Sequence, residues 1–348
     1  MKVGIIFGSA SSEHDVSVVS ASNIIKNLNK KKYDIYPIYL DKTNEWYEVI
    51  DSIKKIENYK FGELPNDTKM INNVFKYLKS MDVIIPVLHG KYGEDGSIEG
   101  LLTMLDIPYV GCKILASSIC MDKVYTKFLL KNAGILVTPS IYIKHEANDF
   151  LYIDESFNEK TVTVGEIDKL IRENFGYPVF VKPSSSGSSI GINKAQNIDE
   201  LNVSLYEARK YDSKILIEKE IKGQELECAI LNKKAISVGE IKASGTFYSY
   251  DSKYKDNKSI TLLEANISSE EENLIKSIAE KAFRVIDGSG LARVDFLKNE
   301  STNEIYLNEI NTMPGFTDIS MYPKLVETSG IDCSSLLDIL IEKARNDN

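Results

Sequence analysis

The best candidates for metal chemistry are polar side chains on two late segments of the chain that are otherwise apolar. Residues 291–297 alternate between polar and apolar, so Arg293 and Asp295 lie on one face of the expected strand. Glu309 and Asn311 share a face in the same way at the end of the next expected strand. Because only a short polar turn separates the two segments, we expect the strands to be neighbours and these four side chains to lie close together.

Two carboxylates and an amide oxygen in one place suggest a hard divalent cation. Burying two carboxylates without a counter-charge would cost on the order of several kcal/mol. Mg²⁺ binds one or two carboxylates together with the phosphate oxygens of a substrate, so we assign Asp295, Glu309 and Asn311 to a magnesium site. The alternative is an internal ion pair from Arg293 to Asp295 or Glu309. We favour the metal because one arginine does not neutralise two acids.

A loop of small residues in the middle of the chain could bind phosphate. Seven of the eight residues in 184–191 are Ser or Gly, and Lys182 lies at the base of the loop. Backbone N–H groups beside a lysine suit phosphate, although a flexible surface loop would have the same composition, and the P-loop pattern is missing. A second lysine, Lys123, opens an earlier helix, and Glu218 and Glu225 follow a later strand, where they could hold ribose hydroxyls. Together these residues predict a nucleotide site.

Two polar loops follow expected strands near the N-terminus. Residues 8–15 lack the glycines of the dinucleotide pattern GxGxxG. An acidic loop at a strand end suits a cationic ligand better, and Glu13 is the candidate. In the second loop, residues 88–96, His89 could be a general base or a structural residue, and the sequence favours neither.

The first third of the chain alternates between strands and helices. Such alternation predicts a parallel α/β sheet that binds ligands at the carboxyl ends of its strands. Ser12 and Asp15 are expected to form a capping box at the start of the first helix. The expected strands are residues 2–7, 35–40, 83–88 and 107–110.

From about residue 117 the pattern becomes mixed α+β. The polar stretch 145–160 resembles a surface insertion, and residues 245–259, which are long, polar and rich in Tyr, suggest a lid over the site. The clearest helix is 269–286, with a capping box of Ser269 and Glu272, and a last helix covers 334–345. The predicted buried stripe of the helix at 269–286 consists of Leu274, Ile278, Ala282 and Val285. The expected strands are 141–143, 179–182, 215–217, 226–231, 235–241, 291–297 and 305–310.

Length and composition limit the kinds of protein that this chain can be. The 348 residues exceed one ordinary domain of ~100–150 residues and predict two or three domains. The net charge of −9 lacks the basic surface typical of nucleic-acid binders, and no apolar stretch approaches the ~18 residues that span a bilayer. Four scattered cysteines without a CxxC pair argue against zinc sites and disulfides. We therefore expect a cytoplasmic protein with no nucleic-acid or membrane partner.

Taken together, these motifs resemble the D-alanine–D-alanine ligases of the ATP-grasp superfamily. They occur in the order typical of that family across nearly the whole chain, with one small departure, Gly8-Ser9 where the family has a Gly–Gly pair. The matching stretches are residues 12–17, 89–96, 120–123, 182–191, 253–254, 292–295 and 308–317.

The resemblance implies an ATP-grasp fold and a division of the chain into three parts. Residues 1–116 would form an N-terminal parallel-sheet domain that binds substrate. Residues 117–212 would form a central ATP-grasp subdomain, and residues 213–348 a C-terminal one that carries the metal site and the lid. The implied cofactors are ATP and Mg²⁺, with Mn²⁺ as an alternative and two ions bridging the phosphates. The implied partners are D-alanine and a second copy of the chain in a homodimer.

The resemblance also implies roles for individual residues. Glu13 would bind the ammonium of the first D-alanine, whose carboxylate attacks the γ-phosphate of ATP, while Arg293 and the Gly315 N–H stabilise charge on that carboxyl group. A second D-alanine would then attack the acylphosphate; the residue that removes its amine proton is left open between His89 and Tyr254. Phosphate binding is implied for Lys123, Lys182, Ser186 and Ser188, and adenine or ribose binding for Glu218 and Glu225. Binding of the second substrate is implied for Lys253, Ser320 and Met321, and His89 is implied to bind substrate. Ser188 and Tyr254 would form a hydrogen-bonded link from Glu13 to the lid.

Two other functions remain open at this stage. The chain could join D-alanine to D-serine or D-lactate, as ligases of the vancomycin-resistance type do. It could also be an ATP-grasp module that binds nucleotide without ligase activity, although the complete set of Asp295, Glu309, Asn311, Lys123 and Lys182 argues against this. Met321 is apolar where resistance-type relatives commonly have arginine, so we expect D-alanine as the second substrate.

Overall fold

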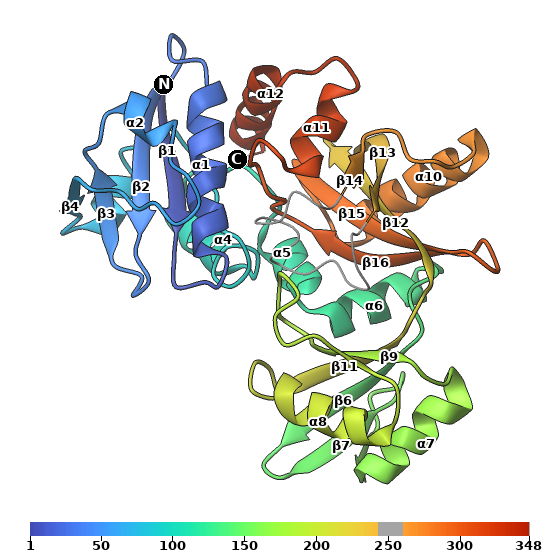
Figure 1. Ribbon diagram of the computed structural model, residues 1–348. Helices are drawn as coiled ribbons and strands as arrows, with labels where there is room; N and C mark the ends of the chain where they lie inside the picture. Colours follow the sequence, from blue (N-terminus) through green and yellow to red (C-terminus); the bar gives the residue numbers. More distant parts are fainter. Residues whose placement is uncertain (243–259, 348) are drawn as a thin grey trace.

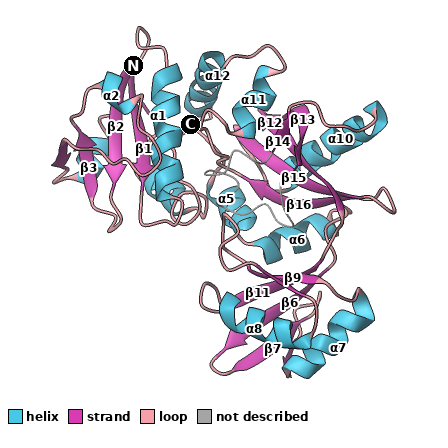
Figure 2. Ribbon diagram, in the orientation of Figure 1, coloured by secondary structure: helices cyan, strands magenta, loops and turns pink. Residues whose placement is uncertain are grey.

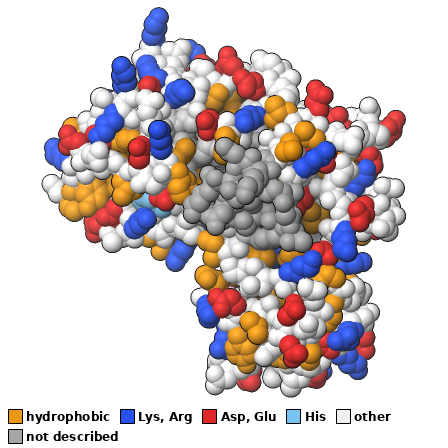
Figure 3. Space-filling view, viewed as in Figure 1, with side chains coloured by type: hydrophobic (Ala, Val, Ile, Leu, Met, Phe, Trp, Pro, Cys, Tyr) orange, Lys and Arg blue, Asp and Glu red, His pale blue; other side chains and the backbone are white. Residues whose placement is uncertain are grey.

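The computed structural model describes residues 1–242 and 260–347 and contains three β-sheets (Figure 1). The predicted lid and its residues Lys253 and Tyr254 lie outside the described residues. Among the described helices, none is long and apolar enough to cross a membrane. On the face shown in Figure 3, acidic and basic side chains are interspersed over the parts not drawn in grey. The four cysteines are unbridged thiols, and three of them are buried.

The first sheet is the parallel sheet predicted for the N-terminal part, with two additional edge strands. Its order is β4-β3-β2-β1-β5. Strand β1 (Lys2–Gly8) is parallel to β2 (Asp34–Leu40) and β5 (Val83–Pro86), whereas β3 (Trp46–Val49) and β4 (Thr68–Met70) pair antiparallel and were not predicted. The strand expected at 107–110 is wrong: only Tyr109 bridges to Ile84. The helices of this part are α1 (His14–Asn27), α2 (Ile53–Ile56), α3 (Val74–Leu78) and α4 (Ser97–Met104).

The second sheet has six antiparallel strands in the order β10-β9-β11-β6-β7-β8. The prediction that residues 145–160 are a surface insertion is wrong, because they supply β7 and the start of β8, with Phe150 and Ile153 buried. Helices α7 (Val164–Asn174) and α8 (Ile198–Ala208) bury their apolar stripes against one face of this sheet (Figure 2). The strands are β6 (Ser140–Glu146), β7 (Asp149–Ile153), β8 (Glu159–Val162), β9 (Val179–Pro183), β10 (Asn193–Ala195) and β11 (Lys214–Lys219).

The third sheet carries the two late strands, and their predicted pairing is confirmed. Its order is β14-β13-β12-β15-β16. Strand β15 (Leu291–Asn299) pairs antiparallel with β16 (Ile305–Asn311), which places Asp295 opposite Glu309 and Arg293 opposite Asn311. The other strands are β12 (Gly223–Leu231), β13 (Lys234–Lys242) and β14 (Ile260–Leu262).

Two predicted helix starts differ in detail from the structure. Helix α10 (Ser269–Val285) is capped by Ser268 with Glu271, one residue before the predicted pair, and its buried residues are Ile275, Ala279, Ala282 and Phe283. Leu274, predicted to be buried, is 49% exposed. The capping box expected from Ser12 and Asp15 is also wrong, because α1 begins after Glu13 and no side chain caps it.

Helix α6 (Lys123–Asn132) lies between the second and third sheets (Figure 1). Val124 and Phe128 pack on Tyr142 and Leu216, on the face of the second sheet that α7 and α8 do not cover. Leu130 packs in the core of the third sheet, together with residues of α5 (Ile114–Met121). Since α6 contacts both sheets, its side chains can reach a site formed between them.

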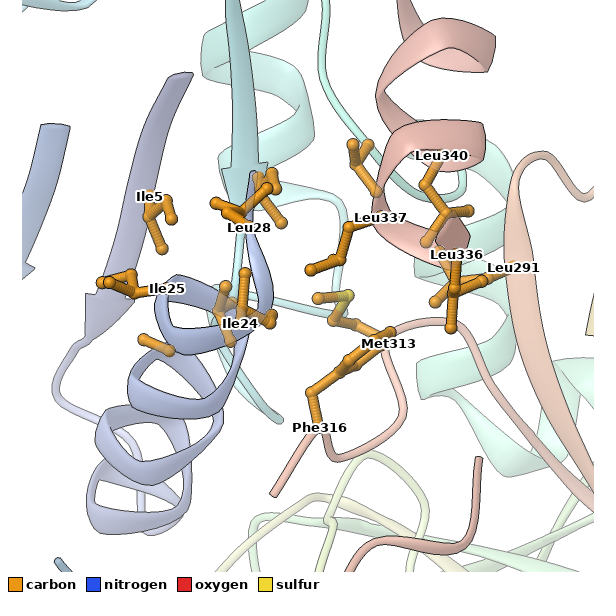
Figure 4. Packing of buried hydrophobic residues seen from close by; sticks show 14 of the residues in the cluster. Ile5, Ile24, Ile25, Leu28, Leu291, Met313, Phe316, Leu336, Leu337 and Leu340 are labelled. Carbon is orange, nitrogen blue, oxygen red and sulfur yellow. The ribbon is translucent and has the colours of Figure 1, made fainter. Parts of the chain in front are cut away.

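The C-terminal segment packs back onto the first sheet. Figure 4 shows Ile24 and Leu28 of α1 facing Leu337 of α12 (Cys333–Asn346), with Met313 and Phe316 beneath them. The short helix α11 (Met321–Glu327) joins the same core. This packing ties the loop after β16 to the N-terminal part. The predicted boundaries at residues 116 and 212 stay a prediction.

Candidate active site

One cavity of about 290 Å³ is lined by strand ends and loops from all three sheets. Every predicted site residue within the described ranges faces it, whereas Lys253 and Tyr254 fall outside those ranges. Residues from both ends of the chain therefore border one space. The predicted residues that line it are Glu13, His89, Lys123, Lys182, Ser186, Ser188, Glu218, Glu225, Arg293, Asp295, Glu309, Asn311, Gly315, Ser320 and Met321.

Glu13 lies at the entrance to α1 and is held from two sides. Its Oε1 accepts a hydrogen bond from Ser188 Oγ of the Ser/Gly loop, and the side chain is 7% exposed. A Cβ atom at Gly90 or Gly187 would come within 2.5 or 2.7 Å of Glu13 Oε2, so a larger residue at either position would displace this carboxylate, and the positive φ of 68° at Gly90 also favours glycine. The preceding Ser9, which replaces a family glycine, adopts the required positive φ of 79°. The result is a fixed, largely desolvated anion at the cavity wall.

Glu94 is a functional candidate that the sequence analysis missed. Its Oε2 accepts from the Gly90 N–H at 2.8 Å and its Oε1 from the Met313 N–H at 3.2 Å. Burial and the nearby charge of Glu13 raise the pKa of Glu94 to about 8. The feature of the sequence that could have identified Glu94 is its position inside the polar loop 88–96. Glu94 links this loop to the loop after β16.

His89 is engaged at both ring nitrogens. Nδ1 lies 3.0 Å from the Met313 carbonyl oxygen, so Nδ1 donates and Nε2 accepts from Ser20 Oγ, also at 3.0 Å. The ring is 3% exposed, and burial lowers the pKa of His89. Of the two roles that the sequence left open, these contacts favour the structural one.

The two predicted phosphate-binding lysines converge from different elements. Lys123, the first residue of α6, donates from Nζ to the Ser186 carbonyl at 2.7 Å and lies 3.6 Å from Glu309 Oε2. Lys182, at the end of β9, pairs with Glu218 Oε2. Burial alone would lower the pKa of Lys182, but Glu218 and other nearby carboxylates raise it. Lys182 is therefore cationic at the cavity surface.

The metal-ligand candidates form an ion-paired cluster with Arg293. Arg293 contacts both oxygens of Asp295 and also Glu227 Oε2 at 3.2 Å. Asn311 Nδ2 donates to Asp295 Oδ2 at 2.9 Å. The internal ion pair weighed as the alternative is thus present, and among the described residues no three His, Cys, Asp or Glu side chains form a metal cluster. Two facing carboxylates and an amide oxygen still match the donors that Mg²⁺ takes when phosphate oxygens complete its shell.

The loop after β16 and the start of α11 form another part of the cavity wall. Phe316 N donates to Ser20 Oγ at 3.2 Å, which anchors the loop containing Gly315 to α1. Ser320 Oγ accepts from the Thr317 N–H at 3.0 Å. Met321 is 5% exposed, and its Cε would lie 3.2 Å from a Cβ atom added at Gly239. The apolar side chain of Met321 and the anchored loop that contains Gly315 thus border this part of the cavity.

Sequence comparisons agree with this geometry. The chain matches two family models, the D-ala D-ala ligase N-terminus over residues 2–112 and the D-ala D-ala ligase C-terminus over residues 129–342. It is 45% identical to a D-alanine–D-alanine ligase of Clostridium acetobutylicum, covering 100% of this chain and 98% of the relative. It is 43% identical to a relative of the same name in Clostridium novyi, covering 99% of this chain and 97% of the relative.

Solved structures are similar over the full length. The D-alanine–D-alanine ligase of Coxiella burnetii has a TM-score of 0.81 at 31% identity, covering 100% of this chain and 96% of that one. The VanG D-Ala:D-Ser ligase of Enterococcus faecalis has a TM-score of 0.83 at 34% identity, covering 99% of each chain. These matches place the chain in the D-alanine–D-alanine ligase family of ATP-grasp enzymes.

Proposed function

We propose that the chain joins two D-alanines to D-alanyl-D-alanine for peptidoglycan precursors, with conversion of ATP to ADP and phosphate. The observation that carries this proposal is the convergence of fifteen described candidate residues on one cavity, in a chain that belongs to the D-alanine–D-alanine ligase family. The carboxylate of the first D-alanine attacks the γ-phosphate and forms an acylphosphate. The amine of the second D-alanine attacks this carbonyl, a peptide bond forms, and phosphate leaves.

Glu13 binds the ammonium group of the first D-alanine. Its carboxylate is held by Ser188 and enclosed by Gly90 and Gly187, so the charge that meets the ammonium group does not reorient. Arg293 and the Gly315 N–H stabilise negative charge on the attacked carboxyl group, as an oxyanion hole does. Glu94 accepts hydrogen bonds from the Gly90 and Met313 N–H groups, and so holds the loop beside Glu13 in a fixed position relative to the loop that carries Gly315.

Nucleotide binding uses the space between the second and third sheets. Lys123 and Lys182 bind the phosphates with backbone donors of the Ser/Gly loop, including Ser186, and Glu218 and Glu225 bind adenine or ribose. Asp295, Glu309 and Asn311 would hold Mg²⁺, or Mn²⁺ in its place, as two ions that neutralise the phosphate charge. Arg293 must then exchange Asp295 for the substrate carboxyl group, and Glu227 remains as its second partner.

The second substrate lies at the end of the cavity bordered by Ser320 and Met321. Ser320, the backbone near Met321 and the lid residue Lys253 bind its carboxylate, and Tyr254 joins the Ser188–Glu13 link. The contacts of His89 leave Tyr254 as the better candidate for removing the amine proton. We further propose a cytoplasmic homodimer whose chains divide at residues 116 and 212.

A D-Ala–D-Ser ligase is the second candidate, favoured by the likeness to the Enterococcus faecalis structure. Release of phosphate from ATP in the presence of Mg²⁺ and D-alanine tests for ligase activity itself. No D-alanine-dependent release would favour a nucleotide-binding module. The mass of the product formed when D-alanine, D-serine and D-lactate compete then identifies the second substrate.

A further inference from the structure

Lys127 is a buried lysine of α6 to which the reaction described above gives no role. It lies one turn after Lys123 and is 5% exposed. Its Nζ is 2.6 Å from Glu218 Oε1, and the Glu218 side chain is 3% exposed. Glu218 lines the cavity, whereas Lys127 is not among the residues that line it. A lysine in this position can influence the nucleotide only through Glu218.

Glu218 is shared between two lysines. Lys127 pairs with its Oε1 and Lys182 with its Oε2. Burial would raise the pKa of Glu218, but Lys127 and then Lys182 lower it to about 2. The alternation of strands β9 and β11 places Lys182 and Glu218 on the face that meets α6. Burial lowers the pKa of Lys127, and its pairing with Glu218 opposes that fall. The cluster therefore places one carboxylate between two lysines, of which only Lys182 borders the cavity.

Binding of ATP must change this cluster. To bind phosphate, Lys182 has to weaken or give up its ion pair with Glu218. A buried carboxylate that loses its only counter-charge is strongly disfavoured, so an enzyme without a second cation would resist the exchange. Lys127 supplies that second cation from a position that phosphates do not reach.

We propose that Lys127 is a positioning residue for nucleotide binding: it keeps Glu218 charged and oriented toward the adenosine, and so releases Lys182 to the phosphates. This inference rests on the proposed binding of ATP. The frame around Lys127 is rigid, because Asp122 caps α6 through the Val124 and Tyr125 N–H groups and pairs with Lys214. Thr126 adds hydrogen bonds to the carbonyls of Ile119 and Asp122.

The first test compares ATP binding by the full chain and by Lys127→Met, measured by calorimetry with Mg²⁺. Methionine keeps the length of the side chain and removes its charge. Loss of one charged partner corresponds to about 10- to 100-fold weaker ATP binding, and D-alanine KM should stay unchanged. The matched control is Lys131→Met on the next turn of α6, where the lysine pairs with Glu155 at the surface; it should bind ATP like the unaltered chain.

The double variant Lys127→Met with Glu218→Gln separates positioning from simple loss of packing. With Glu218 neutral, Lys127 has no anion to hold, so adding Lys127→Met to Glu218→Gln should weaken ATP binding much less than Lys127→Met does in the unaltered chain. A packing role predicts the same loss of ATP affinity in both backgrounds. Should Lys127→Met fail to fold, Lys127→Gln, which can still donate to Glu218, is compared with its own double variant in the same way.

Nucleotide selectivity provides a readout that a purely structural lysine would not change. Inosine triphosphate alters the base and 2′-deoxy-ATP alters the ribose. We expect the preference for ATP over one of these analogues to fall at least several-fold in Lys127→Met. Unchanged ATP affinity and unchanged selectivity in Lys127→Met would overturn the inference. Failure of the unaltered chain to bind ATP would instead overturn the proposed function, so the two failures are distinguishable.

Discussion

Arg293 donates two hydrogen bonds, each 2.7 Å long, to the two carboxylate oxygens of Asp295. Arg293 is proposed to stabilise charge on the substrate and Asp295 to bind Mg²⁺, so their ion pair engages both of the groups that these two ligands would contact. Binding of a cation at Asp295 and release of Arg293 to the substrate are consequently coupled. Glu227 remains in contact with Arg293 and keeps its charge balanced during the exchange.

Asp295→Asn or Glu309→Gln should lower kcat by orders of magnitude while the protein stays folded. Each change removes a negative metal ligand and leaves a side chain of the same shape. The measurement is kcat as a function of Mg²⁺ concentration, with the melting temperature recorded in parallel. Glu304→Gln, an exposed acid just before β16 that binds Tyr306 and Thr302, is the matched control. Near-normal kcat at saturating Mg²⁺ in both site variants would remove these residues from the metal site.

Glu13→Ala should weaken binding of the first D-alanine far more than binding of ATP. The carboxylate faces an ammonium group, and a charged hydrogen bond contributes roughly 1.5–3 kcal/mol, or about 10- to 150-fold in affinity. Titration of each ligand separately checks this. Ser188→Ala, which removes only the hydrogen bond to Glu13, should have a smaller effect in the same direction. Loss of ATP affinity without loss of D-alanine affinity would show that the loop binds the other ligand.

The pairing of β15 with β16 could be predicted because alternation of polar and apolar residues determines which side chains share a face. The cap of α10 could not, since Ser268 and Ser269 are each followed three residues later by a glutamate and only tertiary packing selects the first. The hairpin β7–β8 was missed because half of its residues are polar and face water. A hairpin at the edge of a sheet, such as β7–β8, can have the composition of a surface loop.

Most of the candidate residues that line the cavity could be predicted from the sequence because they lie at a strand end, at the start of a helix or in a small-residue loop. Lys127 and Glu94 were missed for a different reason. A lysine one turn after Lys123 is expected on a solvated helix face, and only the closeness of Glu218 shows that it is buried. The role of Glu94 depends on Met313, which lies far away in sequence and is brought close by the packing of α12 on α1.

Glu99→Gln should stabilise the protein increasingly as the pH rises from 5 to 8. Glu99 is 5% exposed and accepts from Ser117 Oγ, and burial raises its pKa from the ordinary 4.5 to about 7. The folded state therefore favours the protonated acid. The unfolded chain ionises first as the pH rises above 4.5, so folding stability falls until both states are ionised above pH 7.

The size of this effect follows from the pKa difference. A rise of the Glu99 pKa from 4.5 to about 7 corresponds to a loss of about 3 kcal/mol in the free energy of unfolding once both states are ionised. Glutamine cannot ionise and escapes this loss. Melting temperatures of both proteins between pH 5 and 8 provide the measurement, with Ser117→Ala as a control that removes the hydrogen bond but retains the acid. An equal difference in melting temperature at pH 5 and pH 8 would contradict the assignment.

The last prediction concerns the choice of the second substrate, for which D-alanine is expected over D-serine and D-lactate. Met321 lines the cavity, is almost completely buried and packs toward Gly239, so it contributes an apolar side chain to the wall at the site proposed for the second substrate. Such a wall offers no partner to the hydroxyl of D-serine, and burying that hydroxyl costs about 1–3 kcal/mol. Because an apolar pocket rejects an added hydroxyl only weakly, by ~10²-fold at most, some D-Ala-D-Ser should form when D-serine is in excess.

Met321→Arg is the change that tests this selection directly. It should shift products toward D-Ala-D-Ser, because a cation at the wall gives the hydroxyl a polar neighbour, whereas Met321→Leu should keep the preference for D-alanine. Product masses from equimolar D-alanine, D-serine and D-lactate near neutral pH give the ratios for the three proteins. If the unaltered chain already makes mostly a mixed product, or if Met321→Arg leaves the ratio unchanged, the selection is made elsewhere in the cavity and the apolar wall only fills space.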